Sequence, residues 1–510
     1  MTAATARTYL GYEALIRRFN LRVPPLRRVF MATERTIETH ARTSDGDERI
    51  ELPLQRLSDT ESLVGQLTFA LKREHLNLTV LGALFERDEA LTTVQEWLRE
   101  KPSSRYSRTA GHLATWLTGH QFDYTLPPGS PRVSLLDEDE YVTGPGVSDP
   151  KFGVINNVLG NQAFSPLVRR TDKLTTLLNE GLADKVKAAL STIEPEMLSR
   201  AADYLYLSET RSTYNIENEI PDNNRAAKFR RLLESAGEPG ALSEEQLCQW
   251  QNQIVSPLVA EHQYRSVQNW LSRSGRPRNI ADFIPPAPDQ VGLMMEGVAA
   301  VAASGSTGEF DPVLAAACAS FGLVYVHPFL DGNGRLHRFL LHHLLRQSGF
   351  TPAGVVLPLS SRMLKQLERY STLLKSYSRP RTAQLEYLLD SDSGTILVKS
   401  AQPRWLYAYF DATEVCEFIL DCCKLCVEED LLSEVLYLRA HDETVKALES
   451  WLDMRQSQLN TLIDVIVQGN GTLSNRKRKL AEGLTDEQLL KVEATVSEHF
   501  AAYIDSRALT

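Results

Sequence analysis

The chain has 510 residues, more than one hydrophobic core usually contains, so two or three domains are expected. A net charge of −10 argues against a protein whose main task is to coat nucleic acid or anionic membrane. No window approaches the roughly 18 consecutive apolar residues of a membrane span, and the N-terminus does not resemble a signal peptide. Six cysteines do not make a disulfide framework, so we expect a cytoplasmic protein.

The first third of the chain mixes two kinds of pattern. Up to about residue 120, alternating apolar runs such as RVFMATERTIETH predict strands, and stretches such as LVGQLTFALKREHLNLTVLGALFER predict helices. From about 122 to 166, glycines and prolines cluster in LPPGSP, TGPG and SDPKFG, which predicts a linker. We therefore expect a small α+β region of unknown role over residues 1–165.

Helical periodicity dominates the remainder, so the predicted fold class is mainly α. Ser243 with Gln246, and Thr485 with Gln488, have the spacing of a capping box at a helix start. The proline-started PPAPDQVGLMMEGVAAVAA and the apolar FDPVLAAACASFGLVYV predict two more helices. Residues 386–510 are expected to form a separate C-terminal helical module.

The most informative stretch is HPFLDGNGRLHR, from His327 to Arg338. Pro328 disfavours helical dihedrals at His327, so the apolar helix before it must end there. Apolar residues recur at helical spacing further on, so a second helix begins near Asn333 or Gly334. The histidine is therefore presented at a junction between a helix and a loop.

The residues after this histidine predict an anion site. A glycine-rich loop that enters a helix directs free backbone N–H groups and the positive dipole end at one point, and Gly332 and Gly334 permit such a loop. Arg335 and Arg338 oppose the helix dipole by roughly 0.3–1 kcal/mol each unless an anion lies there. Asp331 is a hard oxygen ligand suited to Mg²⁺ beside a substrate phosphate. Together these residues indicate nucleotide phosphate chemistry, although the sequence order of a P-loop is missing.

The same stretch resembles the signature of the Fic family, H-P-F-x-(D/E)-G-N-(G/K)-R-x-x-R, and agrees with it at every specified position. Fic proteins mostly transfer AMP from ATP to a hydroxyl group of a target protein. The resemblance implies a helical bundle with a short β-hairpin flap, which we place over residues 166–385.

The resemblance also implies a role for each residue. His327 would be the general base that takes the proton of a target Ser, Thr or Tyr, which suits an imidazole with an ordinary pKa of about 6.5. Asp331 would hold Mg²⁺ against the α- and β-phosphates. The anion hole would consist of Gly332, Asn333 and Gly334. Arg335 would contact phosphate, and Arg338 would bind the γ-phosphate.

A second stretch, LYLSETRSTYNIENEIP, resembles the Fic inhibitory motif (S/T)-x-x-x-E-(G/N). Thr213, Glu217 and Asn218 occupy its three specified places, on a predicted helix over about 205–220. A Glu217 carboxylate aimed at Arg338 would pair with it in place of the γ-phosphate, so that ATP would bind only unproductively. A capped surface helix is the alternative interpretation of so short a pattern.

Residues 264–297 resemble the segment before the signature in many Fic proteins, where a β-hairpin flap precedes two prolines and a helix. A target segment would add to the flap as an extra strand through backbone hydrogen bonds. The flap would contain Ile280, Ala281, Asp282 and Phe283. Tyr370 stands where an aromatic often lines the adenine pocket, with a core or surface tyrosine as the alternative.

These features predict a protein adenylyltransferase with ATP as co-substrate, Mg²⁺ as cofactor and a target protein as partner, inhibited by its own Glu217. The alternatives are a Fic enzyme that transfers another group or removes AMP, a scaffold without catalysis, and a DNA-linked regulator that uses the C-terminal helices. The basic run SNRKRKL is more typical of a solvated helix face than of a nucleic-acid site. Nucleic acid and membrane are therefore not expected as partners, and a homo-oligomer is possible.

Overall fold

The computed structural model describes residues 8–44, 46–191, 193–272, 280–390 and 395–508. It is mainly helical, as predicted, and its strands gather in the first third of the chain and near residue 400. The chain divides into two compact units, of which the first holds residues 1–176, 238–344 and 368–418. The second holds 177–237, 345–367 and 419–510. Consecutive domains with boundaries at 165 and 385 stay a prediction.

The first unit begins with a four-stranded sheet in the order β1-β2-β4-β3. Its strands are β1 (Thr8–Leu10), β2 (Arg28–Thr33), β3 (Thr39–Arg42) and β4 (Glu48–Pro53). The central pair β2–β4 is parallel and the two outer pairs are antiparallel. Leu10, Phe30, Ile50 and Leu52 form one buried cluster, because side chains at alternate positions of a strand share a face. The α+β character expected for this region is confirmed.

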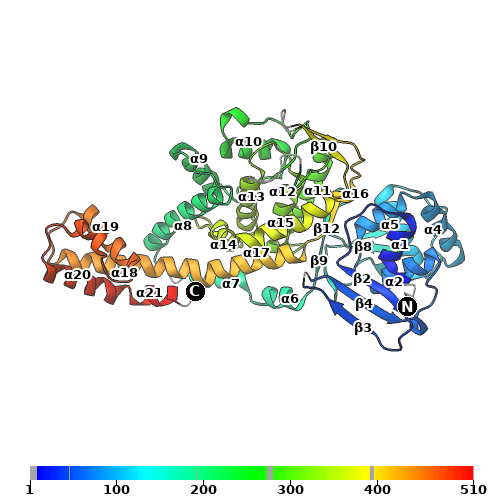
Figure 1. Ribbon diagram of the computed structural model, residues 1–510, viewed down its shortest axis with the longest axis horizontal. Coiled ribbons are helices and arrows are strands. Elements are labelled where there is room, and N and C mark those ends of the chain that lie inside the picture. Colours follow the sequence, from blue (N-terminus) through cyan, green and yellow to red (C-terminus); the bar gives the residue numbers. More distant parts are fainter. Residues whose placement is uncertain (1–7, 45, 192, 273–279, 391–394, 509–510) are drawn as a thin grey trace, which may run out of the picture. The chain divides into compact units, whose positions relative to one another are not determined.

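Helices cover this sheet and extend the N-terminal part (Figure 1). They are α1 (Gly11–Phe19), α2 (Leu63–Arg73), α3 (Leu78–Phe85), α4 (Asp88–Glu100) and α5 (Arg105–Thr118). Phe69 of α2 packs against the strand cluster, with its ring 5.5 Å from that of Phe30. This contact attaches the helices to the apolar face of the sheet.

The linker predicted over residues 122–166 is wrong, because this segment contains paired strands. They are β5 (Val133–Ser134), β6 (Tyr141–Val142), β7 (Val147–Asp149), β8 (Val154–Asn156) and β9 (Ser165–Arg169). Phe152 and Val154 are fully buried, which excludes an open connection. The glycines and prolines do form turns, but these turns join strands too short to show an alternating pattern in the sequence.

The remaining helices of the first unit surround the HPFLDGNGRLHR stretch. They are α10 (Glu244–Ile254), α11 (Pro288–Ser306), α12 (Pro312–Val326) and α16 (Trp405–Ala408). Some helices have residues in both units. They are α6 (Asp172–Asn179), α13 (Asn333–Gln347), α15 (Leu367–Thr382) and α17 (Thr413–Leu425). The Ser243 side chain accepts a hydrogen bond from the Gln246 N–H and starts α10, as its sequence spacing predicted.

Three short strands lie at the beginning of the segment that we predicted to be helical from residue 386. They are β10 (Tyr387–Asp390), β11 (Thr395–Val398) and β12 (Tyr409–Asp411). β10 and β11 pair with each other in antiparallel fashion, whereas β12 pairs with β9 in parallel. Apart from the short helix α16 just before β12, the helical part of this segment begins with α17.

Phe164, just before β9, anchors the N-terminal part to the helices of the same unit. Its side chain is fully buried. A Cβ atom at Gly297 of α11 would lie 2.6 Å from the Phe164 Cβ, and one at Gly322 of α12 would lie 2.6 Å from its Cζ. The two glycines therefore leave the space that this ring fills.

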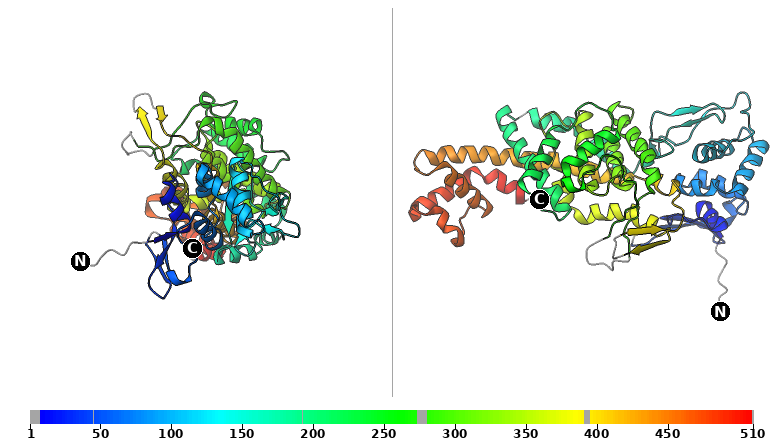
Figure 2. Two further views of the ribbon diagram at one scale, coloured as in Figure 1. Left: turned by 90° about the vertical axis from the view of Figure 1, so that its right-hand side faces the viewer. Right: turned by 90° about the horizontal axis from the view of Figure 1, so that it is seen from above.

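The second unit contains helices and no strand among its described residues. Its helices are α7 (Leu182–Ser191), α8 (Pro195–Ile216), α9 (Asn223–Glu234), α14 (Leu359–Lys365), α18 (Leu432–Glu449), α19 (Gln456–Gln468), α20 (Asp486–His499) and α21 (Ala501–Ala508). Figure 2 shows α18 to α21, coloured orange to red, folded against one another. The capping box predicted at Thr485 and Gln488 is complete at the start of α20. No helix in the described part of the chain has the length and apolar character that crossing a membrane requires.

We expect Phe164→Ala to lower the free energy of unfolding of the first unit by about 3–5 kcal/mol, because the cavity between two glycine-lined helices cannot easily collapse. Urea unfolding of the full chain, followed by tryptophan fluorescence, measures this change. Val147→Ala is the matched control, because Val147 is 72% exposed. A loss below about 1 kcal/mol for Phe164→Ala would contradict the packing described here.

Candidate active site

The candidate site lies where α12 ends and α13 begins. α12 stops at Val326, and His327 follows with φ 55° and ψ 61°, the left-handed conformation. α13 begins at Asn333, and both boundaries agree with the sequence prediction. A left-handed residue other than glycine costs roughly 1–2 kcal/mol, so the surrounding structure must hold His327 in this conformation.

Arg265 supplies that hold. Its guanidinium donates to the carbonyl of His327 at 2.8 Å and to that of Val326 at 3.4 Å, and it also reaches Pro286 and Val267. The Arg265 backbone N–H donates to the Pro328 carbonyl at 2.8 Å. Burial lowers the pKa of Arg265 to about 10, so the side chain is still charged at neutral pH. The Arg265 cation thus satisfies the free carbonyls at the end of α12 and interacts favourably with the negative end of the helix dipole.

Three other side chains, of which Asn333 and Gln251 are buried, fix the rest of the loop. Asn333 accepts from the Phe329 N–H at 3.0 Å and donates to the Phe329 carbonyl at 2.7 Å. Glu261 accepts from the Leu330 N–H at 2.8 Å, and Gln251 donates to the Asp331 carbonyl at 3.3 Å. The Asn333 side chain therefore braces the loop, so its contribution to an anion hole would come from its backbone N–H.

The orientation of the His327 ring follows from one hydrogen bond. Its Nδ1 lies 3.3 Å from the Val324 carbonyl, and a carbonyl oxygen can only accept. Nδ1 therefore carries the proton in neutral imidazole, which makes Nε2 the basic nitrogen. The side chain is 6% exposed, so this nitrogen belongs to a largely desolvated group. This is the tautomer that a general base requires.

Asp331 has the properties of a cation ligand. Its side chain is 48% exposed, and Oδ1 accepts from the Gly332 N–H at 2.6 Å and from Arg335 at 3.2 Å. No hydrogen bond or ion pair to Oδ2 occurs within the described ranges. Asp331 is thus a half-exposed carboxylate whose Oδ2 makes no such contact, and it lies beside a helix N-terminus that can receive phosphates. This arrangement fits the ligand preference of Mg²⁺.

The two arginines of the signature are buried below the loop. Arg335 is 2% exposed and Arg338 is 1% exposed. The Tyr370 hydroxyl lies 3.5 Å from the Arg338 guanidinium and 3.0 Å from Nε2 of His337, and Tyr370 is itself 3% exposed. Tyr370 therefore contacts a signature arginine, while its role in an adenine pocket stays a prediction.

His337 is neutral in this environment. Burial, helped by the charge of Arg338, lowers the pKa of His337 to about 3. Its ring stacks on Tyr370 and meets Phe321 edge-on. A neutral imidazole leaves Arg338 as the charged group of this pair, which suits an arginine that binds an anion.

The inhibitory motif lies at the end of α8, in the second unit. Thr213 is fully buried, Glu217 is exposed at the C-cap, and Asn218 has a positive φ of 56°. Glu209 of the same helix is also buried, and its carboxylate accepts hydrogen bonds from the backbone and the hydroxyl of Ser360 at the start of α14. The motif thus terminates a helix that a buried carboxylate anchors within its own unit.

The predicted flap is partly described. Leu271 and Phe283 form an antiparallel bridge, with the Leu271 N–H 2.9 Å from the Phe283 carbonyl. Ile280 is 42% exposed, whereas Phe283 is buried. The Ala281 N–H donates to the Tyr387 hydroxyl of β10, and Asp282 lies 3.8 Å from Arg379. Residues 273–279, which would form the turn of the hairpin, lie outside the described residues.

The structure brings the signature residues together at one helix junction and adds three that sequence reasoning missed. These are Arg265, Gln251 and Glu261, which hold the backbone of the loop. They belong to no short motif, and their distance in sequence from His327 hides their contact. The only signal in the sequence was that Arg265 and Glu261 lie close to apolar residues. Arginine and glutamate are usually exposed, so this signal did not predict their contact with the loop.

Comparisons with known proteins concern this same part of the chain. Residues 241–345 match the model of the Fic/DOC family. Protein adenylyltransferase fic-1 of Caenorhabditis briggsae is 41% identical over 317 residues, which cover 54% of this chain and 60% of that protein. Protein adenylyltransferase Fic of Drosophila grimshawi is 36% identical over 83 residues, or 16% of this chain and 17% of that protein. The chain therefore spans 60% or less of these two relatives.

Among solved structures, a Fic family protein from Desulfovibrio desulfuricans matches 64% of this chain and 89% of its own, with 19% sequence identity and a TM-score of 0.37. The segment matched by the family model contains α10 to α12 and the start of α13, and so includes the whole signature.

We expect Arg265→Leu to loosen the loop, because the carbonyls of Val326 and His327 lose their donor. An unsatisfied buried carbonyl costs about 1–3 kcal/mol, so amide hydrogen exchange over residues 327–333 should accelerate by about fivefold or more. Exchange measured by mass spectrometry tests this. Arg99→Leu, at a 62% exposed side chain, is the control. Unchanged exchange in Arg265→Leu would show that the loop does not depend on this side chain.

The pKa of His337 also predicts a pH dependence of stability. Between pH 6.5, the ordinary pKa, and the folded value of about 3, the unfolded chain binds one more proton than the folded chain at this residue. Its contribution therefore lowers the free energy of unfolding as pH falls, by about 1.4 kcal/mol per pH unit, and is constant above pH 6.5.

His337→Asn should accordingly give a shallower decline of stability than the parent protein between about pH 6.5 and pH 4. Urea unfolding at several pH values measures both slopes, and exposed His40→Asn serves as the control. Equal slopes for the parent and His337→Asn would mean that His337 titrates normally in the folded protein.

Proposed function

We propose that this protein is a protein adenylyltransferase, because residues 241–345 match the model of the Fic/DOC family and contain the complete signature. It transfers AMP from ATP to the hydroxyl group of a Ser, Thr or Tyr of a target protein. The observation that carries the proposal is the position of His327 in the loop that enters α13. The contact of its Nδ1 with the Val324 carbonyl makes Nε2 the basic nitrogen.

In the proposed reaction, the target hydroxyl oxygen attacks the α-phosphorus of ATP. A new oxygen–phosphorus bond forms, the bond to the bridging oxygen breaks, and pyrophosphate leaves. Nε2 of His327 takes the hydroxyl proton, which makes the oxygen a stronger nucleophile in the transition state. The low exposure of His327 favours this step, because proton transfer then does not compete with bulk water.

The start of α13 would hold the phosphates. The first turn of a helix directs backbone N–H groups towards its N-terminus, and the positive dipole end favours an anion. Buried Arg335 and Arg338 add charge in a low-dielectric setting, where it acts more strongly than on the surface. Asp331 would bind Mg²⁺, whose charge would neutralise part of the phosphate charge.

We also propose that Glu217 inhibits the enzyme by pairing with Arg338 in place of the γ-phosphate. The match of Thr213, Glu217 and Asn218 to the motif supports this, as does the place of Glu217 at the exposed end of α8. Anchoring of α8 through Glu209 and Ser360 would limit how far the helix can move when ATP competes.

The flap residues from Ile280 to Phe283 would receive the target as an added strand. The bridge between Leu271 and Phe283 supports this, because it fixes one end of a hairpin in extended form. A cytoplasmic location is part of the proposal and is supported by the six cysteines, all of which are buried free thiols.

Labelled ATP tests the proposed reaction. We expect Glu217→Gly to increase the transfer of label from α-labelled ATP to the protein itself or to lysate proteins by about tenfold or more, since one charge-assisted pair contributes about 1.5–3 kcal/mol. His327→Ala in the Glu217→Gly background should lower transfer by about 10²–10⁴-fold. Glu219→Gly, two positions away, is the matched control and should leave transfer unchanged.

The outcomes separate the competing activities. Transfer from γ-labelled but not α-labelled ATP would replace AMP transfer with phosphate transfer. Absence of any transfer by Glu217→Gly, in a protein that still binds ATP, would overturn the proposed reaction. Equal transfer by the parent protein and Glu217→Gly would overturn only the inhibitory role.

A further inference from the structure

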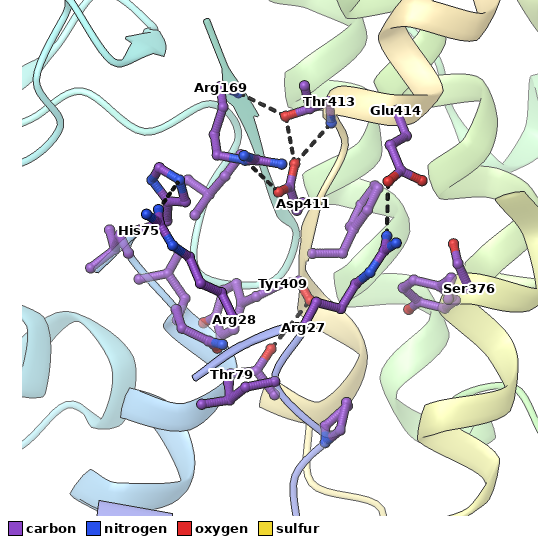
Figure 3. A pocket seen from close by; sticks show the side chains of 18 of the residues that line it. Arg27, Arg28, His75, Thr79, Arg169, Ser376, Tyr409, Asp411, Thr413 and Glu414 are labelled. Atoms are coloured by element: carbon purple, nitrogen blue, oxygen red, sulfur yellow. Dashed lines mark hydrogen bonds and ion pairs between the residues drawn. The ribbon is translucent and has the colours of Figure 1, made fainter. Parts of the chain in front are cut away.

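The first unit contains a cavity of about 750 Å³ that the proposed reaction does not use (Figure 3). Its lining includes Arg27, Arg28 and His75 from the N-terminal part, and Arg169 at the end of β9. No residue from His327 to Arg338, all of which the structure describes, is among its lining residues. A volume of this size lies within the roughly 300–1,000 Å³ of pockets that bind small molecules.

Three ion pairs line the cavity, and Figure 3 shows two of them together with the contact between Arg28 and His75. Arg169 lies 2.7 Å from Asp411, which follows from the pairing of β9 with β12. Arg27 lies 2.8 Å from Glu414, at the start of α17. Arg28 of β2 lies 3.4 Å from Glu48 of β4. Positive and negative groups therefore alternate around one space.

These pairs are weak enough for a ligand to rearrange. Their side chains are 30–58% exposed, and solvent-exposed ion pairs contribute only about 0–1 kcal/mol. The Arg28 Nε lies 3.4 Å from Oε2 of Glu48, in an ion pair that lacks the alignment of a hydrogen bond. A ligand carboxylate that reached Arg28 and Arg169 would form charge-assisted hydrogen bonds with both guanidinium groups.

The balance of charge decides which ligand fits. The lining contains five arginines, namely Arg27, Arg28, Arg42, Arg169 and Arg381, and five carboxylates, namely Glu48, Glu74, Asp411, Glu414 and Glu417. A phosphate would therefore meet carboxylates, and a polyamine would meet guanidinium groups. A ligand that carries one negative and one positive group can satisfy both sets, with its anion at Arg28 and Arg169 and its cation at Asp411 and Glu414. Thr79 also lines the cavity, and its hydroxyl donates to the Tyr409 carbonyl (Figure 3).

We propose that this cavity is a binding site for a short peptide that carries an acidic and a basic side chain. Tyr325 and Tyr377 also belong to the wall of the cavity; each is 2% exposed and their rings stack on each other at 3.8 Å, so this side of the cavity is closed and apolar. Tyr325 stands two residues before His327 on α12, so the bound peptide would contact the helix that positions the base. The binding proposal does not depend on the chemistry at His327.

Calorimetric titration of the full chain tests the site. The probes are capped tripeptides with alanine in the middle. One end is lysine or arginine and the other is aspartate or glutamate, and both orders are used. We expect saturable binding of at least one of them, weakened about tenfold or more in Arg28→Gln and in Glu414→Gln, since each loses a charge-assisted bond. Arg18→Gln is the matched control, because Arg18 pairs with Glu89 in the same unit but does not line the cavity.

Two further probes and the folding of the variants complete the design. Inorganic phosphate and the capped neutral peptide Gln-Ala-Gln should not bind, and circular dichroism should show the same helix content in all variants. Absence of binding by every charged tripeptide, equal binding of phosphate, or unchanged binding in Arg28→Gln would each overturn the proposal. Binding without any change in label transfer would leave the site standing, because the two measurements are independent.

Discussion

The geometry of the candidate active site depends on one contact, the guanidinium of Arg265 against the carbonyls at the end of α12. A helix that ends at a left-handed histidine before a proline is unfavourable by itself, because both the backbone conformation and the free carbonyls cost energy. Arg265 offsets both terms, since it donates to the carbonyls and places a positive charge at the negative end of the helix. Without this contact, the carbonyls of Val326 and His327 would lose the donor that Arg265 supplies.

The same principle extends to the loop that follows. Asn333, Glu261 and Gln251 satisfy its backbone before any ligand arrives, so a nucleotide would meet N–H groups that are already oriented. Preorganised donors are effective in catalysis because they need not reorient as charge develops. The neutral state of His337 belongs to this arrangement, because a second cation beside Arg338 would repel it.

The N-terminal part of the first unit shares its core with the helices around the signature. Phe164 fills the space between two glycines of α11 and α12, and β9 pairs with β12 from the far end of the unit. The cavity with its three ion pairs arises from the same pairing, because β9 presents Arg169 beside Asp411. A change in the N-terminal part can therefore reach α12 through direct packing.

The sequence by itself determined the mainly helical class, the end of α12 at His327, the start of α13 and the capping box at Thr485. These features depend on residues close together in the chain, where proline, glycine and capping side chains act directly on the backbone. The identities of the site residues from His327 to Arg338 were also readable, because their chemistry is concentrated in twelve consecutive positions.

Only the tertiary structure decided which distant side chains hold that site. Arg265 and Glu261 contact the loop across more than sixty residues of chain, and no local pattern records such a contact. The strands between 122 and 166 were missed for a related reason, because a strand of two or three residues is stabilised by its partner and not by its own sequence. Burial likewise sets the pKa of His337, and burial is a property of the folded chain alone.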